Sequence, residues 1–170
     1  ITSQYGTPPV KIGTPEVLKR VKSEMGGALR FSSGDYDAPF YVDLVFSKKE
    51  PKPKEKETPS KEDQEAQQKE KIQELINGII NDFQSRGAVN ILIKEEKITT
   101  LSGLAAPKIY GTLDYPKKAK DKRVRCNYTT HLFDFEQGGI NLTLLYEKED
   151  RYGEEIEKRI VDSFELIKEL

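Results

Sequence analysis

The residues of this 170-residue chain that could do chemistry are few and scattered. Its one histidine, His131, lies in a strand-like segment, and a Ser-His-Asp triad would have to use it. Ser102 and Ser163 are available as nucleophiles, but neither lies in the Gly-x-Ser-x-Gly turn of the hydrolases. We therefore expect His131 to be a half-exposed or hydrogen-bonded strand residue rather than a general base.

Carboxylates are more plentiful, and a pair of them can act as acid and base in glycoside hydrolysis. They fall near turns and on helix faces, where surface charges normally lie; the residues are Asp134, Glu136, Glu147, Glu149, Asp150, Glu154 and Glu155. With one cysteine and one histidine, the chain also lacks the ligands of a structural zinc site. We expect no catalytic residue, no metal and no cofactor.

The sharpest local charge lies in a turn between two strand-like segments. Six cations are opposed there only by Asp121; they are Lys117, Lys118, Lys120, Lys122, Arg123 and Arg125. This cluster can attract phosphates, an acidic protein or an anionic lipid surface. The alternative is a soluble hairpin whose charges prevent edge-to-edge pairing. The whole chain carries 28 basic and 29 acidic residues, so we expect no specific nucleic-acid partner.

A second candidate surface is a loop rich in acidic and aromatic side chains. It contains Asp35, Tyr36, Asp37 and Tyr41. Tyrosines on an exposed loop are typical anchors of a protein interface. The alternative is an ordinary turn whose Phe40 enters the core.

Hydrophobic periodicity predicts the elements that position these residues. Helical spacing indicates helices at 14–25, about 62–86 and 153–169, the first beginning at the capping pair Thr14-Pro15. Alternation indicates strands at 28–32, 40–46, 88–94, 98–101, 107–115, 123–135 and 140–146. Glu95-Glu96 is expected to turn between two of them. Gly111 inside another strand indicates a bulge or a close backbone approach.

A charged stretch at 47–71 interrupts this pattern. It has three prolines, one alanine and no aromatic residue, so it cannot bury enough surface to offset the loss of chain entropy. We expect a mobile charged loop at about 47–62, with a docking tail as the alternative, followed by a helix capped by Ser60 and Asp63. The first 46 residues are too few for a core of their own, so the sequence predicts a single domain over 1–170.

Two further features concern the compartment of the protein. No apolar run approaches the roughly 20 residues that span a bilayer, so we expect no transmembrane segment in this chain. The chain begins at Ile1, which is compatible with a signal peptide or a lipid anchor upstream. Cys126 has no cysteine to pair with, and we expect a small, half-buried strand residue there.

The C-terminal part of the chain resembles the PsbP-like domains over roughly residues 70–170. The resemblance rests on the segments GLAAPKIYGTLDYP, RVRCNYTTHLFDFEQGGINLTLLYEKED and EEIEKRIVDSFELI. In that superfamily a helix precedes a glycine-containing strand, a long antiparallel hairpin and a closing helix. Its members include the PsbP extrinsic subunit of photosystem II, a Ran-binding nuclear import factor and bacterial envelope lipoproteins. The resemblance implies a non-enzymatic binding role, and it supplies no catalytic residues.

The sequence therefore predicts an α+β fold, a mostly antiparallel sheet flanked by helices on both faces, which is the PsbP-like α/β/α sandwich. We expect a non-catalytic binding or accessory module of the bacterial cell envelope or periplasm, with an unknown protein partner or an anionic surface. Two alternatives stay open. A closed apolar cavity would indicate a small-ligand carrier, and a deep pocket that holds a carboxylate with a raised pKa would indicate an enzyme.

Overall fold

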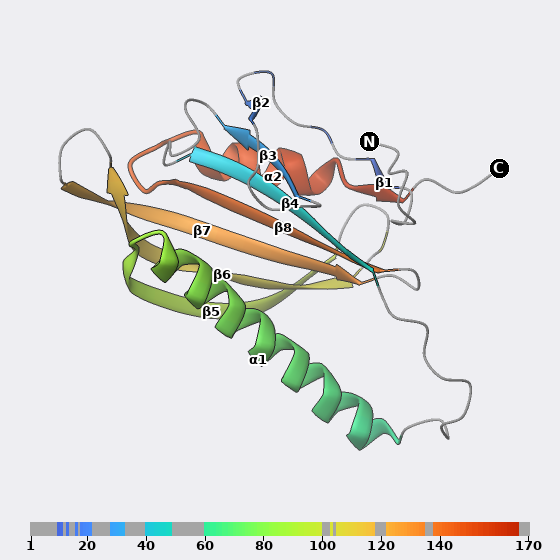
Figure 1. The fold of residues 1–170 in the computed structure, drawn as a ribbon. Helices are drawn as coiled ribbons and strands as arrows, with labels where there is room; N and C mark the ends of the chain where they lie inside the picture. Colours follow the sequence, from blue (N-terminus) through green and yellow to red (C-terminus); the bar gives the residue numbers. More distant parts are fainter. Residues whose placement is uncertain are drawn as a thin grey trace.

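Seven antiparallel strands form the main sheet in a computed structural model of the chain (Figure 1). The structure describes residues 10–11, 13, 16, 18–21, 28–32, 40–48, 60–99, 103, 105–117, 122–134 and 138–166. The strand order is β2-β3-β4-β8-β7-β6-β5. The strands are β2 (Lys19–Val21), β3 (Ala28–Ser32), β4 (Phe40–Lys48), β5 (Val89–Thr99), β6 (Ala105–Lys117), β7 (Lys122–Asp134) and β8 (Gly138–Glu147).

Two helices and a small second sheet complete the described residues. Helix α1 (Lys61–Ser85) follows β4 in the chain, and α2 (Gly153–Asp162) follows β8. The short strands β1 (Val10–Lys11) and β9 (Glu165–Leu166) pair with each other. Neither of the two described helices is both long and apolar enough to cross a membrane.

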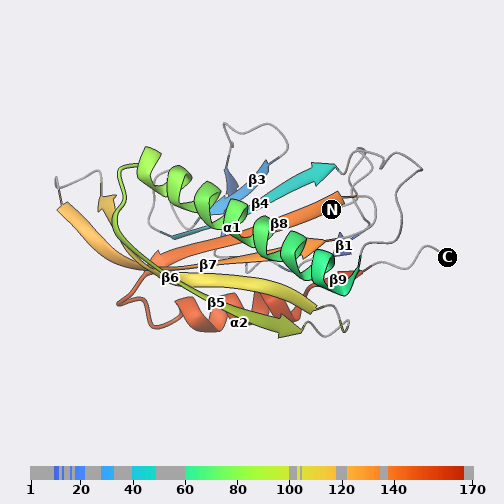
Figure 2. The same ribbon diagram turned by 90° about the horizontal axis from the view of Figure 1, so that it is seen from below.

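Each helix packs against its own hydrophobic cluster, and the two clusters alternate along the strands. The α1 cluster includes Ile76, Ile79, Phe83, Tyr41, Ile109, Leu113, Cys126, Tyr128 and Leu145. The α2 cluster includes Ile160, Phe164, Val42, Leu44, Ala106, Phe133, Ile140, Leu142 and Leu144. Figure 2 shows α1 and α2 separated by the sheet. The strands therefore carry apolar side chains toward both helices, which explains their dense apolar composition.

Local sequence signals account for the start of α1. The Ser60 Oγ accepts a hydrogen bond from the backbone N–H of Asp63, and the Asp63 carboxylate accepts one from the N–H of Ser60. This reciprocal cap is the one predicted. Residues 61–71 are exposed throughout, and burial begins only at the apolar stripe that contains Ile76. Packing of that stripe, rather than the polar turns, attaches the helix to the sheet.

The strand predictions at 28–32, 40–46, 107–115, 123–135 and 140–146 are confirmed within a few residues, as is the helix at about 62–86. Gly111 also behaves as predicted. A Cβ on it would lie 1.9 Å from the carbonyl oxygen of Leu92, where β5 bulges between Val89 and Leu92. The glycine is needed because the backbone of β5 occupies that space. The α+β class with a mostly antiparallel sheet is therefore correct.

Three predictions are wrong in whole or in part, each because tertiary pairing outweighed local signals. The helix at 14–25 is contradicted at Lys19–Val21, which pairs with β3 instead. The closing helix ends at Asp162 rather than 169, because the chain turns at Ser163 and continues into β9. Glu95-Glu96 does not turn, because β5 pairs with β6 without interruption through both residues.

The charged loop has narrower limits than predicted. Strand β4 extends to Lys48, and α1 begins at Lys61, so both ends of the predicted loop at 47–62 are regular structure. The remainder, 49–59, lies outside the described residues, and the prediction of mobility there stays a prediction.

Candidate functional site

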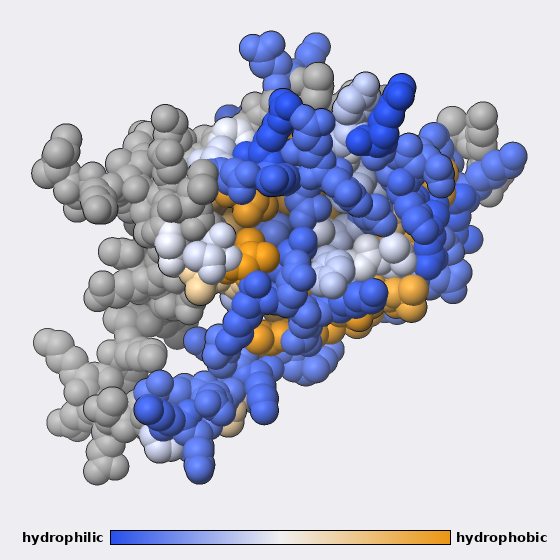
Figure 3. Space-filling view, turned by 180° about the vertical axis from the view of Figure 1, so that it is seen from behind, coloured by the Kyte–Doolittle hydropathy of each residue, from blue (hydrophilic) through white to orange (hydrophobic). Residues whose placement is uncertain are grey.

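A groove of about 870 Å³ lies between α2 and the outer strands of the sheet. We call it the α2 groove. Its floor is formed by β5, β6 and β7 with Tyr146 of β8, and one wall is formed by α2. Figure 3 views the molecule from this side and shows apolar residues in the middle part of this face, with polar residues around them. The volume falls within the range of about 300–1,000 Å³ that is common for ligand sites.

The floor consists of side chains in three rows that cross the strands. The strand registers define the rows as Lys108–His131, Lys94–Tyr110–Thr129 and Leu92–Thr112–Asn127–Tyr146, and Glu96, the register partner of Lys108, lies outside the groove lining. Alternation places all of these side chains on the face that α2 packs against. The floor is therefore polar at its centre, although the same face of the sheet is apolar where α2 packs on it.

The wall of the groove comes from one stripe of α2. Residues Glu154, Glu157, Lys158, Val161 and Asp162 line it at the i, i+3, i+4, i+7 and i+8 positions of one helix face. Close packing at Gly153 brings the helix onto the sheet. A Cβ at Gly153 would lie 2.1 Å from the ring of Tyr146, so only glycine fits there. This contact fixes the first turn of α2 beside the groove.

Glu157 is the centre of a buried polar cluster, with a side chain 11% exposed. Its carboxylate lies 3.2 Å from the Lys108 Nζ and 3.7 Å from the His131 Nε2, and it accepts a 3.4 Å hydrogen bond from the Tyr146 hydroxyl. Burial raises the pKa of Glu157, but His131 and Lys108 outweigh it, and the net pKa is lowered. Burial likewise raises the pKa of Tyr146, with a further rise from Glu157. The carboxylate is therefore held in its charged form.

Three polar atoms on the floor have no hydrogen-bond partner among the described residues. They are the Oγ1 of Thr129 and both ring nitrogens of His131. Thr129 is 4% exposed and His131 is 1% exposed, and both line the groove. Each unpaired buried polar group costs about 1–3 kcal/mol of folding free energy. Such a group stores strain that serves a function, or its hydrogen bond is completed by an ordered water, an ion or a ligand.

The basic turn predicted from sequence does not form one surface in the described residues. Lys117 pairs with Glu147 at 2.8 Å, and Arg125 pairs with Asp114 at 2.9 Å. Asn90 and Arg125 hydrogen-bond to Asp114 and lower the pKa of its carboxyl. Two of the six cations are therefore already neutralised by carboxylates.

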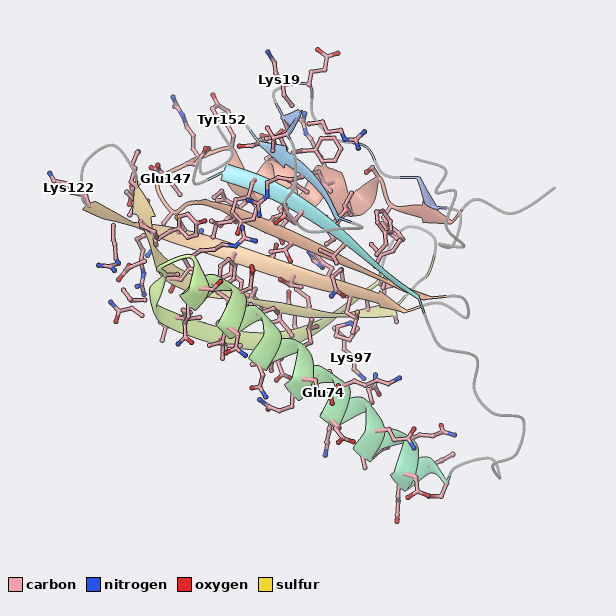
Figure 4. All side chains as sticks on the ribbon, viewed as in Figure 1. Lys19, Glu74, Lys97, Lys122, Glu147 and Tyr152 are labelled. Atoms are coloured by element: carbon pink, nitrogen blue, oxygen red, sulfur yellow. The ribbon has the colours of Figure 1, made fainter. Side chains whose placement is uncertain are left out.

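The remaining cations of this turn are divided by the strand geometry. Lys122 is the register partner of Lys117 and projects at the tip of β7 (Figure 4). Alternation places Arg123 on the opposite face from Lys122, where it donates a 3.4 Å hydrogen bond to the Gly87 carbonyl. Lys118 and Lys120 lie outside the described residues. Among the cations of this turn that the structure describes, Lys122 and Arg123 are exposed.

The acidic and aromatic loop patch is wrong for the one member that the structure describes. Tyr41 is 1% exposed, because its ring lies 4.2 Å from the guanidinium of Arg30 and 6.5 Å from the ring of Tyr115. Burial raises the pKa of Tyr41 well above its ordinary value. Asp35, Tyr36 and Asp37 lie outside the described residues.

Cys126 is more deeply buried than the half-buried residue that was predicted. It is 0% exposed in the α1 cluster, and burial raises the pKa of its thiol to about 12. Its strand position is as predicted, and a neutral buried thiol is unreactive. Among the described residues, no group of three His, Cys, Asp or Glu side chains is placed to hold a metal ion.

Sequence reasoning identified the floor of the α2 groove only in part. Alternation along the predicted strand at 123–135 puts Arg125, Asn127, Thr129, His131 and Phe133 on one face. It missed Lys108 and Glu157, whose position beside His131 depends on strand register and on the docking of α2. The sequence signal for the floor was that the strand at 123–135 is long enough to lie at the centre of the sheet and yet carries polar residues on one face.

Comparison with known proteins shows the fold. No family model matches the sequence, and no curated protein matches it. The chain is similar to the solution structure of cyanobacterial PsbP (CyanoP) from Synechocystis sp. PCC 6803, with a TM-score of 0.50 over 98% of each chain. The fold is PsbP-like. At 13% sequence identity the likeness extends to the arrangement of strands and helices, and the chemistry of the α2 groove rests on its own residues.

Proposed function

We propose that this protein is a non-catalytic binding module with the α/β/α layering of the PsbP-like domains, and that it holds a protein partner in the α2 groove. The observation that carries the proposal is that Thr129 and His131 line the open groove and carry three buried polar atoms that make no hydrogen bond among the described residues. A bound partner would supply the missing hydrogen bonds, so the cost of burying these groups would be recovered on binding.

The electrostatics of the groove support binding rather than acid–base catalysis. A general acid at neutral pH needs a raised pKa, whereas the pKa of Glu157 is lowered. As a base, Glu157 would be weakened by its contact with Lys108. The only histidine, His131, lies 3.7 Å from the Glu157 carboxylate, and its ring stacks on that of Phe133 with 6.2 Å between the ring centroids. The enzyme with a carboxylate-based site is therefore the less favoured function.

The shape of the groove also favours a partner over a carried small molecule. A carrier of apolar ligands needs a closed apolar cavity. The α2 groove opens to solvent at Leu92, which is 59% exposed, and its centre holds the ion pair of Lys108 and Glu157. An open, partly polar site suits a segment that enters from outside.

We place the module in the periplasm or envelope of a bacterium. The support is the resemblance to the envelope lipoproteins of the PsbP-like superfamily, together with a fold similar to cyanobacterial PsbP. The exposed cations Lys122 and Arg123 provide a second contact, to an acidic part of the partner or to an anionic surface.

The test compares two substitutions on one strand. Leu92→Glu changes an exposed side chain that lines the groove, and Val89→Glu changes an exposed side chain, 39% exposed, outside the groove lining. We expect native envelope extract to yield a protein that wild type and Val89→Glu retain and that Leu92→Glu loses at least tenfold. Equal recovery by both variants would place the site elsewhere.

A second arm of the same experiment tests the basic turn. It uses the variant in which Lys117, Lys118, Lys120, Lys122, Arg123 and Arg125 are all changed to Ser. Loss of the partner in this variant alone, with Leu92→Glu unaffected, would move the proposed site from the α2 groove to the turn. A modest loss that depends on salt is the result expected of a secondary contact.

A further inference from the structure

The charges that line the α2 groove are balanced. Lys94, Lys108 and Lys158 face Glu154, Glu157 and Asp162. Lys108 lies within 3.2 Å of both Glu96 and Glu157, so its charge is already compensated. A ligand with a large net charge therefore gains no overall attraction here and must compete with pairs that exist already. The balance favours an uncharged occupant.

The floor atoms that make no hydrogen bond are the Thr129 Oγ1 and the two ring nitrogens of His131, of which Nε2 also lies 3.7 Å from Glu157. Such groups require both donors and acceptors. A threonine hydroxyl can donate and accept, and an imidazole ring donates through an N–H and accepts through a ring nitrogen that carries no proton. A carboxylate or a phosphate offers acceptors only, and an ammonium group offers donors only. The peptide group offers one donor and one acceptor, so it matches Thr129 and His131 in turn.

The spacing of these two residues matches an extended chain. Thr129 and His131 are two positions apart on β7 and lie on the same face. At a rise of about 3.3 Å per residue, their side chains repeat at about 6.6 Å along the strand. Peptide groups that point the same way in an extended chain repeat at the same distance. A segment lying along β7 would therefore meet both residues in register.

Apolar side chains border this polar line. Tyr110 lies beside Thr129 in its row, Leu92 lies at the open end, and Val161 lies on the α2 wall. They can pack against the side chains of an extended segment while its backbone bonds to the floor. Addition to the free edge of β5 is less favourable, because Lys94, Glu95, Glu96 and Lys97 place charges along that edge.

On the basis of the proposed function, we infer that the α2 groove takes an extended, uncharged peptide segment of the partner, whose backbone amides bond to Thr129 and His131. The recognition is by the backbone at the floor and by apolar side chains at the rim. Lys108 and Glu157 hold His131 in place and keep charged segments out.

The test uses three pools of N-acetylated, C-amidated hexapeptides that are neutral, acidic or basic. Since His131 is the only histidine, NMR of the imidazole nitrogens in the untagged protein reports on this site alone. We expect the neutral pool to shift the His131 signals with saturation. Thr129→Val should weaken that binding at least tenfold. The Thr130 Oγ1 instead lies 2.9 Å from the Thr143 Oγ1, so Thr130→Val should bind the neutral pool as wild type does.

Two results would overturn the inference. One is a shift of the His131 signals by the acidic or basic pool and not by the neutral one. The other is equal binding of the neutral pool by wild type and Thr129→Val. If Leu92→Glu abolishes partner capture while no pool binds, the inference of an extended peptide segment is wrong and the proposed function stands. If capture is also insensitive to Leu92→Glu, both are wrong.

Discussion

Replacing Thr129 by valine should make the free protein more stable. The hydroxyl of Thr129 is buried, with 4% of the residue exposed, and it has no partner among the described residues. Valine has nearly the same shape and removes the unpaired oxygen, while its strand propensity is similar. An unpaired buried hydroxyl costs about 1–3 kcal/mol, so the free energy of unfolding should rise by about that amount.

The neighbouring residue provides a matched control. Thr130 is 1% exposed, and its Oγ1 lies 2.9 Å from the Thr143 Oγ1 on the adjacent strand. Thr130→Val breaks this hydrogen bond and should lower the free energy of unfolding by about 0.5–1.5 kcal/mol. Two consecutive, equally buried threonines should therefore respond to the same substitution with opposite signs.

Urea unfolding measures both changes at once. The midpoint should rise for Thr129→Val and fall for Thr130→Val, with the slope of the unfolding free energy on urea concentration unchanged. For a chain of this length, each kcal/mol corresponds to about 2–4 °C in Tm. If Thr129→Val destabilises as much as Thr130→Val, the hydroxyl has a partner in the free protein, and the argument for an unfilled binding site in the α2 groove fails.

Three further predictions concern single side chains. Because the pKa of Glu157 is lowered on folding, its contribution to stability is present above the unfolded pKa of about 4.3 and is lost as pH falls through the folded value. Urea midpoints from pH 7 to pH 3 should therefore fall less steeply in Glu157→Gln than in wild type, and identical slopes would contradict this. Gly153→Ala should destabilise by about 1–3 kcal/mol because its Cβ overlaps the Tyr146 ring, whereas Gly78→Ala, with open space in α1, should stabilise by about 0.5–1 kcal/mol in thermal unfolding. Cys126, with a pKa of about 12, should react with iodoacetamide at pH 8 only after urea is added; rapid native labelling would show that the α1 cluster opens.

Much of the sheet could be predicted because strand alternation and turn residues are local. The antiparallel pairing of β7 and β8 follows from alternating side chains on both sides of a glycine-containing turn, and the structure confirms the pairing, with Gly138 and Gly139 inside β8. The start of α1 follows from Ser60 and Asp63. At Lys19–Val21 the same local reasoning failed. The apolar spacing there suited a helix, but the segment completes the edge of the sheet beside β3.

The sequence by itself determined which side chains share a face of each strand, and alternation alone was enough to group Thr129 with His131. It also determined that the chain has too few cysteines and histidines for a zinc site. Only the tertiary structure decided that Lys108 lies beside His131 and that the Glu157 carboxylate contacts both. The physical reason is that a shift of the strand register by one residue, or of the docking of α2 by one helical turn, would separate these groups without changing any local sequence pattern.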